Sequence, residues 1–418
     1  MSVGIVNNHD RRVPPARLCA FSPIVLACAL IATVLSSSAC FAVAQVHDVL
    51  CDKGNGSFNA SFKTGVRVSV GPVKSGALSI RACQATLAWG KDSLTVATGV
   101  AEIDLDMFGV ELADAGPVAA FQVREESGAC CVTYKIYSLE TPPRLLRTVT
   151  GGEYFAGQDT DMDGRVEIWA GDAASLRGFE GLFPGEVEFV PNYVLRLEQS
   201  KLYDATPQFK SYFDDVIDQV RKQMDPGLMH EFQASDGRLL VHIGAPTEEL
   251  ARNHRLRKAK IQALEIVWAY LYTGREKEAQ QALDELWPKS DVTRIYAAIV
   301  AARQGSIQSQ LDPPPASEHK NKPGSAWIYN RREASSPQAI MMRIYPPPQN
   351  VTLTLQGEVR LELIIDSAGK VRSVVNSNKK EGLDEYIRYS AREWKFIPAY
   401  RNSLSVASRM TTDIYALQ

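Results

Sequence analysis

Residues 356–375, QGEVRLELIIDSAGKVRSVV, are the stretch that most directly indicates a fold. Apolar side chains alternate with polar ones from Val359 to Ile365, which is the period of a half-buried strand. The segment Asp366–Lys370 carries turn residues, and the alternation returns over Val371–Val375, so the pattern predicts a β-hairpin. A helix is expected from Asp384 to Ala391, with a last strand ending near Tyr415. Residues 341–418 are therefore predicted to form a small α+β domain.

The residues at the turns and element boundaries of this domain resemble those of the TonB C-terminal domain family. The matching residues are Tyr345 and Pro346 at the entry, Gly357 before the first strand, Asp366 and Gly369 in the hairpin, Leu383 and Asp384 at the helix, and Trp394, Phe396 and Pro398 after it. The resemblance implies a three-stranded sheet with one packed helix, whose free edge can accept a strand from a partner. Trp394 and Phe396 are interpreted as core residues. Proline at Thr412, in the last strand, is expected to remove a donor from that edge.

Residues 306–340, which precede this domain, have the composition of a linker. They are rich in proline, serine, lysine and asparagine, include Pro313-Pro314-Pro315, and show no hydrophobic period. Because a linker separates the domain from the rest of the chain, we expect the domain to fold on its own.

Upstream of the linker, residues 204–305 have a helical period. One stripe contains Ile261, Leu264, Trp268 and Leu271, and a second contains Ala279, Ala282, Leu283 and Leu286. Gly274 and Pro288 are expected to end these two helices, and a third helix is expected to run from an N-cap at Ser290 to Gly305. The small residues and helix breakers Ala263, Gly274, Ala279 and Pro288 resemble those of tetratricopeptide repeats over one repeat and part of a neighbour. A helical spacer without repeat function remains the alternative.

Residues 45–203 are expected to form an antiparallel β domain. Val66–Val70, Leu94–Val96 and Val132–Tyr137 alternate between apolar and polar side chains, and glycine or proline separates such segments. The fold class predicted for the whole chain is therefore multidomain: an N-terminal antiparallel β domain, a central α-helical, tetratricopeptide-like region, and a C-terminal small α+β TonB-like domain.

The β domain carries one motif typical of a metal site. Asp159, Asp161 and Asp163 alternate before Gly164, and Glu167 closes the run. Calcium prefers six to eight oxygen ligands, and a tight acidic loop can direct alternate carboxylates at one ion. Calcium is thus the cofactor that these four carboxylates predict.

The main-chain carbonyl of Arg165 completes the predicted ligand set. The loop resembles the calcium loops of integrin-type FG-GAP blades more than those of EF-hands, because Ala170 stands where an EF-hand has its bidentate glutamate. An acidic turn whose carboxylates face water is the alternative. Asp104–Gly109 is similar to a degenerate copy of the loop that binds nothing.

The start of the chain indicates export. Arg11, Arg12 and Arg17 precede an apolar run over 24–35, and Ala42-Val43-Ala44 fits a cleavage site. This order is typical of a secretory signal peptide over residues 1–44, which predicts a periplasmic protein. The apolar run is too short for a membrane anchor, which needs about 20 residues. A lipoprotein attached through Cys40 is the weaker alternative.

Four cysteines remain after the signal peptide: Cys51, Cys83, Cys130 and Cys131. An even number in an exported chain favours disulfides, although the sequence leaves their connectivity open. We favour a bridge between Cys51 and Cys83, or from one of them to the adjacent pair, whose side chains would point to opposite faces of a strand.

Composition and motifs exclude several classes of function. The net charge of −2 offers no basic surface for nucleic acid. The histidines are scattered, and the sequence contains no nucleophile elbow or phosphate-binding glycine loop, so no catalytic residue is predicted.

The function expected is that of an exported periplasmic, non-enzymatic protein, not spanning the membrane when mature, whose TonB-like domain binds a protein partner of the cell envelope. A TonB-type energy transducer for outer-membrane transport is the first alternative, although such members hold an uncleaved anchor and a long proline-rich arm. An enzyme of unknown mechanism is the second.

Overall fold

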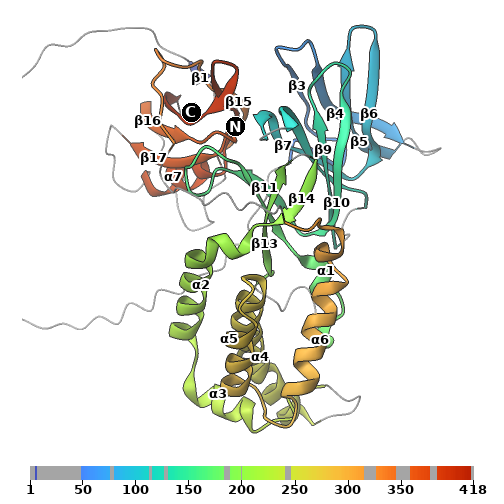
Figure 1. The fold of residues 1–418 in the computed structure, drawn as a ribbon, viewed down its shortest axis with the longest axis vertical. Helices are drawn as coiled ribbons and strands as arrows, with labels where there is room; N and C mark the ends of the chain where they lie inside the picture. Colours follow the sequence, from blue (N-terminus) through green and yellow to red (C-terminus); the bar gives the residue numbers. More distant parts are fainter. Residues whose placement is uncertain are drawn as a thin grey trace, which may run out of the picture.

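The computed structural model describes the chain in three parts, two packed sheet-rich parts and one of helices (Figure 1). The described residues are 5–6, 49–75, 80–112, 115–126, 130–182, 189–198, 200–240, 246–314, 326–344, 358–376 and 384–415. The predicted signal-peptide residues Arg11 to Ala44 lie outside these ranges. Antiparallel sheets and several helices agree with the multidomain fold class expected from the sequence.

The first part, the β region, begins with two antiparallel sheets. One has the strand order β3-β4-β5-β6 and the other the order β10-β9-β8-β7-β2. The strands of the first are β3 (Phe58–Ser61), β4 (Arg67–Ser75), β5 (Ile80–Trp89) and β6 (Asp92–Val100). Those of the second are β2 (Cys51–Asp52), β7 (Glu102–Glu111), β8 (Pro117–Arg124), β9 (Val132–Ser138) and β10 (Arg144–Gly152). Their facing apolar side chains, Val68 and Leu87 with Leu105 and Phe121 among them, share one core.

Two disulfides lie in the β region. Cys51 on β2 is bonded to Cys83 on β5, so this bridge joins the two sheets, as one of the predicted pairings requires. Cys130 and Cys131 are bonded to each other. They precede β9 and do not lie on a strand, so the condition under which they would point to opposite faces is not met.

A third antiparallel sheet, of order β11-β12-β13-β14, connects the β region to the helices. Its strands are β11 (Phe155–Gln158), β12 (Glu167–Gly171), β13 (Asn192–Glu198) and β14 (Lys201–Asp204). The short helices α1 (Ala173–Leu176) and η2 (Phe179–Gly181) follow β12. β11 and β12 form a hairpin in which Gln158 pairs with Glu167, so the acidic motif is the loop that closes this hairpin.

The helical part contains the three helices that the sequence predicts, α4 (Thr247–Tyr272), α5 (Glu276–Leu286) and α6 (Val292–Gln304). It also has η3 (Thr206–Phe209), α2 (Lys210–Gln223), α3 (Pro226–Gln233) and η4 (Ile307–Gln310), which were not predicted individually. The N-cap of α6 is Asp291 rather than the predicted Ser290. Its side chain makes no cap hydrogen bond and instead pairs with Arg294 in the first turn.

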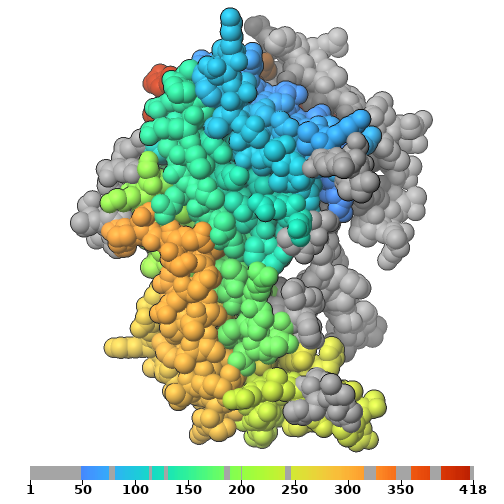
Figure 2. All heavy atoms as spheres, turned by 90° about the vertical axis from the view of Figure 1, so that its right-hand side faces the viewer, coloured from blue at the N-terminus to red at the C-terminus, as the bar shows by residue number. Residues whose placement is uncertain are grey.

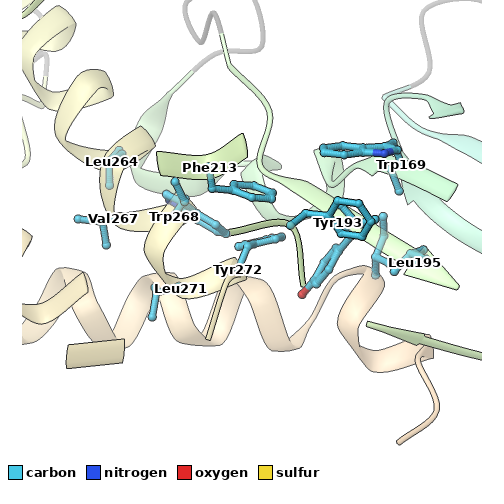
Figure 3. Close-up of a cluster of buried hydrophobic side chains, with 14 of the residues drawn as sticks. Trp169, Tyr193, Leu195, Phe213, Leu264, Val267, Trp268, Leu271 and Tyr272 are labelled. Atoms are coloured by element: carbon cyan, nitrogen blue, oxygen red, sulfur yellow. The ribbon is translucent and has the colours of Figure 1, made fainter. Parts of the chain in front are cut away.

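Aromatic side chains join the helices to the third sheet. Tyr193 of β13 contacts Tyr272 of α4 with ring centroids 4.4 Å apart, and Trp268 lies one turn earlier on α4 (Figure 3). Tyr193, Trp268 and Tyr272 belong to one core that extends from the sheet into the helices. None of the helices in the described ranges is both long and apolar enough to cross a membrane.

Part of the predicted linker is packed rather than free. Ile307 in η4 is fully buried, and the Gln310 side-chain amide exchanges hydrogen bonds with the backbone of Thr150 on β10. Asp312 accepts from the backbone of Leu202 and pairs with Arg147. In Figure 2 the orange segment at the upper end of the helical part lies against the β region. Composition alone does not predict these contacts, because they depend on partners more than 100 positions away in the sequence.

The C-terminal part has the predicted hairpin, helix and last strand. Its main sheet has the order β1-β21-β16-β17. The strands of the part are β15 (Gln338–Met341), β16 (Glu358–Ile365), β17 (Val371–Asn376), β18 (Lys395–Ile397), β19 (Ala399–Arg401), β20 (Leu404–Val406) and β21 (Ser408–Tyr415); its helix is α7 (Asp384–Arg392), and β1 is Ile5–Val6 from the start of the chain. β18 pairs with β15, and β19 with β20, outside the main sheet.

The turn residues of this part have definite structural roles. The Asp366 carboxylate accepts from the backbone of Ala368 and Lys370, which closes the β16–β17 turn. Gly369 has φ of +83°, and a Cβ there would lie 1.9 Å from the carbonyl oxygen of Phe396. Only glycine fits this position.

Trp394 and Phe396 are buried in the core of the C-terminal part, as interpreted from the sequence. Pro398 lies between β18 and β19, and Asp384 begins α7. Tyr345, Pro346, Gly357 and Leu383 lie outside the described residues.

Candidate metal centre

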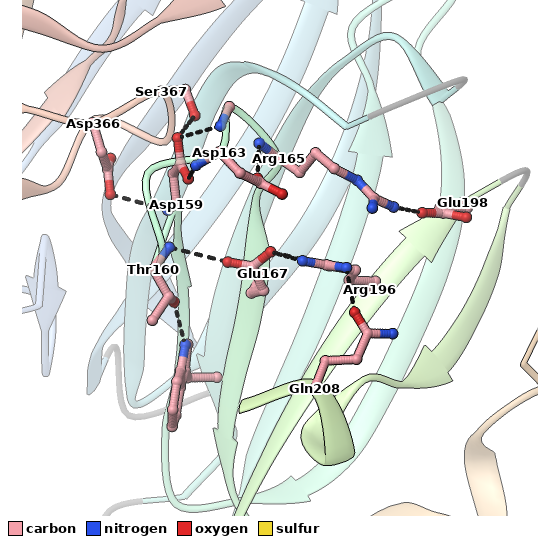
Figure 4. Close-up of polar contacts among 12 residues, drawn as sticks. Asp159, Thr160, Asp163, Arg165, Glu167, Arg196, Glu198, Gln208, Asp366 and Ser367 are labelled. Atoms are coloured by element: carbon pink, nitrogen blue, oxygen red, sulfur yellow. Dashed lines mark hydrogen bonds and ion pairs between the residues drawn. The ribbon is translucent and has the colours of Figure 1, made fainter. Parts of the chain in front are cut away.

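The loop between β11 and β12 and the first residue of β12 bring three carboxylates together, and Figure 4 shows two of them, Asp159 and Glu167. Asp159, Asp161 and Glu167 each offer an oxygen, and these oxygens lie within 4.8 Å of one another. Asp159 and Glu167 are fully buried. We call these three residues the carboxylate trio.

Asp159 shapes the loop as well as belonging to the trio. Its Oδ1 accepts from the backbone N–H of Asp163 at 3.0 Å and its Oδ2 from that of Gly164 at 3.0 Å. Gly164 has φ of +88°, which lets the chain reverse beneath the carboxylate. The sequence-predicted alternation therefore produces a turn wrapped around Asp159.

Asp161 differs from its neighbours because both of its carboxylate oxygens are buried and meet no donor at full hydrogen-bond geometry among the described residues. Burial raises the pKa of this carboxyl, and the backbone N–H groups of Asp163 and Asp161 lie close enough to oppose that rise. A buried charge is stable only when it is paired or coordinates a metal. Asp161 is therefore the strongest indication that the loop holds a cation.

Glu167 has a protein cation beside it. Its Oε1 accepts from Arg196 Nε at 3.0 Å and Nη2 at 2.6 Å, and its Oε2 accepts from the backbone of Thr160 at 3.0 Å. Arg196 is 2% exposed and also donates to Gln208. This arginine reduces the net charge of the trio by one, so an ion would meet a site of charge −2 rather than −3.

The side chains of the other two predicted ligand residues, Asp163 and Arg165, make contacts outside the trio. The Asp163 carboxylate accepts from the backbone N–H of Arg165 at 2.8 Å and is not part of the trio. The Arg165 guanidinium pairs with Glu198 on β13. Coordination by Asp163 and by the Arg165 carbonyl stays a prediction, and calcium would take its other oxygens from the main chain and water.

Burial and mutual repulsion raise the pKa values of the three carboxylates of the trio. Burial first, and then the charge of Asp366, raise the pKa of Asp159 to about 7. Burial also raises the pKa of Glu167 to about 7 against the opposing effect of Arg196, and it raises the pKa of Asp161. Near neutral pH the loop therefore holds protons, which a divalent cation could replace.

These raised values predict how calcium binding varies with pH. The pKa of Asp159 in the unfolded chain is near 3.8 and in the folded protein about 7. In chelator the folded state binds more protons between these values, so its free energy of unfolding falls as pH rises through that window. Calcium displaces the protons, so its stabilising effect should be larger at pH 8 than at pH 5.5. Thermal melts with calcium and with chelator at both values check this, and an equal calcium effect at the two pH values would contradict it.

The loop also contacts the C-terminal part of the chain. The backbone N–H of Asp159 donates to Asp366 Oδ2 at 3.0 Å, and Ser367 Oγ donates to Asp159 Oδ2 at 3.0 Å. Arg372 on β17 donates to Gln158 and to the backbone of Thr160. The β16–β17 turn thus packs directly on the candidate metal centre.

Two lysines of the C-terminal part extend this junction. Lys370 Nζ lies 2.5 Å from Asp106 Oδ1, and Lys395 pairs with Asp104. Asp104 and Asp106 lie on β7, buried, and not in a loop, so their resemblance to a degenerate calcium loop is misleading. Residues two apart on a strand share a face, and this spacing is the signal that could have identified them as a pair.

Comparison with protein-family models, with curated proteins and with solved structures finds no match to this chain.

Proposed function

We propose that this chain is an exported, non-enzymatic protein of the cell envelope that binds a protein partner by strand addition to β21. The observation that carries the proposal is the pairing of β1 with β21, in which Ile5 faces Ile414 and Val6 faces Asp413. β1 lies inside the predicted signal peptide. Its removal on export would leave the same edge open to a strand of another protein.

The register of β21 identifies the backbone groups that such a strand would use. The N–H of Arg409 donates to the carbonyl of Tyr329, on the side of β21 away from β16. Backbone N–H groups two residues apart on a strand point the same way, so those of Thr411 and Asp413 also point outward. The open edge therefore runs from Thr411 to Tyr415.

The β17 edge is a poorer candidate for the same role. Arg372, near the start of β17, donates to Gln158 Oε1 at 3.1 Å and to the Thr160 carbonyl at 2.8 Å, so this end lies against the β region. An incoming strand would have to displace these contacts.

Thr411→Pro is the substitution that tests the proposal. Thr411 is exposed, and its N–H points away from β16, so proline removes an outward donor and leaves the β16 ladder intact. Thr412, the position suggested by the sequence alone, is buried and its N–H points toward β16. Thr412→Pro should therefore unfold the sheet and is not a clean test.

The experiment uses the chain from Gln45 to Gln418 with a photo-crosslinking amino acid at Arg409, and envelope extract of the organism that encodes it. Intact mass of the exported protein first verifies that it begins at Gln45. A crosslinked partner should form with the parent and with Thr411→Ala, and decrease at least tenfold with Thr411→Pro. A crosslinker at Lys277, exposed on α5, serves as the surface control. Equal capture by a folded Thr411→Pro protein would show that the partner binds elsewhere.

A further inference from the structure

Four arginines lie around the place where the open edge of β21 stops. They are Arg331 and Arg332, which follow Tyr329 in the chain, Arg401 at the end of β19, and Arg409 on β21. All four are exposed, and none of them has a carboxylate partner among the residues that the structure describes. We call these four residues the arginine cluster.

Tyr329 contacts two members of the cluster directly. Its backbone N–H donates to the carbonyl of Ala407 and its own carbonyl accepts from the N–H of Arg409, both at 2.9 Å. The guanidinium carbon of Arg401 lies 4.6 Å from the centroid of the Tyr329 ring. Arg331 and Arg332 come two and three positions after Tyr329, so they belong to the same surface.

The carboxylates around the cluster offset only part of its charge. Glu333 lies in the same turn as Arg331 and Arg332, and its Oε2 accepts from the backbone N–H of Asn330 at 3.0 Å. Glu362 faces Thr411 across the sheet. Four arginines against these two glutamates leave an excess of two positive charges. This surface therefore favours a negatively charged partner.

The direction of β1 indicates which end of an added strand would reach the arginine cluster. β1 is antiparallel to β21, with Ile5 opposite Ile414 and Val6 opposite Asp413. A strand that continues in this direction passes Thr411 and then reaches Arg409. There Tyr329 already pairs with β21, so the residues that follow the added strand would leave the sheet beside the arginine cluster.

We propose that the β-strand of the partner is followed directly by acidic residues, whose carboxylates pair with the arginine cluster. Guanidinium groups bind carboxylates through two parallel hydrogen bonds, and arginine is enriched in protein interfaces. This inference rests on the proposed strand addition and names the chemistry of the partner. Main-chain pairing would supply affinity, and the charges would select among partners.

The test uses two synthetic peptides, with binding to the chain from Gln45 measured by calorimetry. Both contain the same strand of alternating threonine and valine, which continues into four glutamates in one peptide and four glutamines in the other. The glutamate peptide should bind at least tenfold more tightly at low salt, and high salt should remove most of this difference because exposed charges are screened. Equal affinity of wild type for the two peptides at low salt would overturn the inference.

Variants separate the charge contact from the strand addition. Arg331→Gln combined with Arg332→Gln should lose most of the preference for glutamate and bind the glutamine peptide as wild type does. Lys277→Gln combined with Lys289→Gln removes the same charge from exposed residues on and just after α5, and this control should keep the preference. Thr411→Pro should weaken both peptides alike.

The two proposals fail in different ways. A folded variant without Arg331 and Arg332 that keeps the full preference would contradict the role of the arginine cluster and leave strand addition standing. A folded Thr411→Pro protein that binds both peptides as wild type does would contradict strand addition. Failure of both peptides to bind wild type would overturn strand addition and, with it, this inference.

Discussion

Calcium is expected to raise the melting temperature of the mature protein, and Asp161→Asn is expected to abolish that rise. A ligand that binds only the folded state stabilises it by about 2.7 kcal/mol at a concentration about 100 times its Kd. The three converging carboxylate oxygens of the trio are the groups that would hold the ion. Differential scanning calorimetry in calcium and in chelator measures both parts of the prediction.

The sign of the Asp161→Asn effect should differ between the two conditions. Both oxygens of Asp161 are buried and meet no donor at full hydrogen-bond geometry among the described residues, so in chelator this carboxylate destabilises the fold. Removing its charge should make the variant more stable than wild type in chelator, by about 1 to 3 kcal/mol, which is the penalty of an unsatisfied buried group. In calcium the order should reverse because the variant has lost a ligand.

Asp163→Asn is the matched control. Asp163 carries the same charge in the same loop, but it accepts from the Arg165 backbone and does not join the trio. Its amide oxygen can keep that hydrogen bond, so the calcium response should persist. Loss of the response in both variants would support the alternating ligand set expected from the sequence. A wild-type melting temperature unaffected by calcium would show that the trio does not hold the ion.

Local chemistry explains what could be predicted about the C-terminal part. The alternation of β16, the turn at Asp366 and the requirement for glycine at position 369 are all properties of neighbouring residues. The stripe that contains Trp268 predicted α4 for the same reason. The hydrophobic period and the turn residues are properties of a few consecutive positions, so a single sequence is enough to detect them.

The parts that were missed depend on distant residues. Lys370 lies 264 positions from Asp106, and the Arg196 that pairs with Glu167 is on another strand. No local hydrophobic period indicates which lysine pairs with which aspartate. For this reason the sequence does not predict the packing of the C-terminal part on the acidic loop, and the linker that suggests an independent domain is itself partly packed.

The ion pair between Lys370 and Asp106 should make a large contribution to the stability of the assembled chain. Asp106 is 2% exposed, and it accepts from Tyr134 Oη at 2.5 Å and from the backbone of Gly157 at 2.8 Å as well as from Lys370. Lys370→Met removes the only one of these three partners that carries a formal positive charge. Breaking one side of a buried pair typically costs about 3 to 5 kcal/mol because the remaining charge is uncompensated.

A double-mutant cycle isolates this interaction from other effects of the substitutions. Asp106→Asn alone leaves Lys370 without its carboxylate, but the amide can still accept from Tyr134 and Gly157. The double variant removes both charges, so its free energy of unfolding should be higher than the sum of the two single losses implies. Urea unfolding of the four proteins provides the measurement, and Arg372→Met, at an exposed contact across the same junction, should cost less than about 1 kcal/mol.

The number of unfolding transitions decides between a docked and an independent C-terminal part. If the junction formed by Asp106 and Lys370 stabilises the chain as its burial implies, wild type should unfold without a separate early transition of the C-terminal part. Lys370→Met should then lower the urea midpoint of that single transition, because the C-terminal part loses an anchor on β7. A Lys370→Met protein that unfolds at the wild-type urea midpoint would mean that this pair does not hold the two parts together, and a separate early transition in wild type would mean that the C-terminal part unfolds independently.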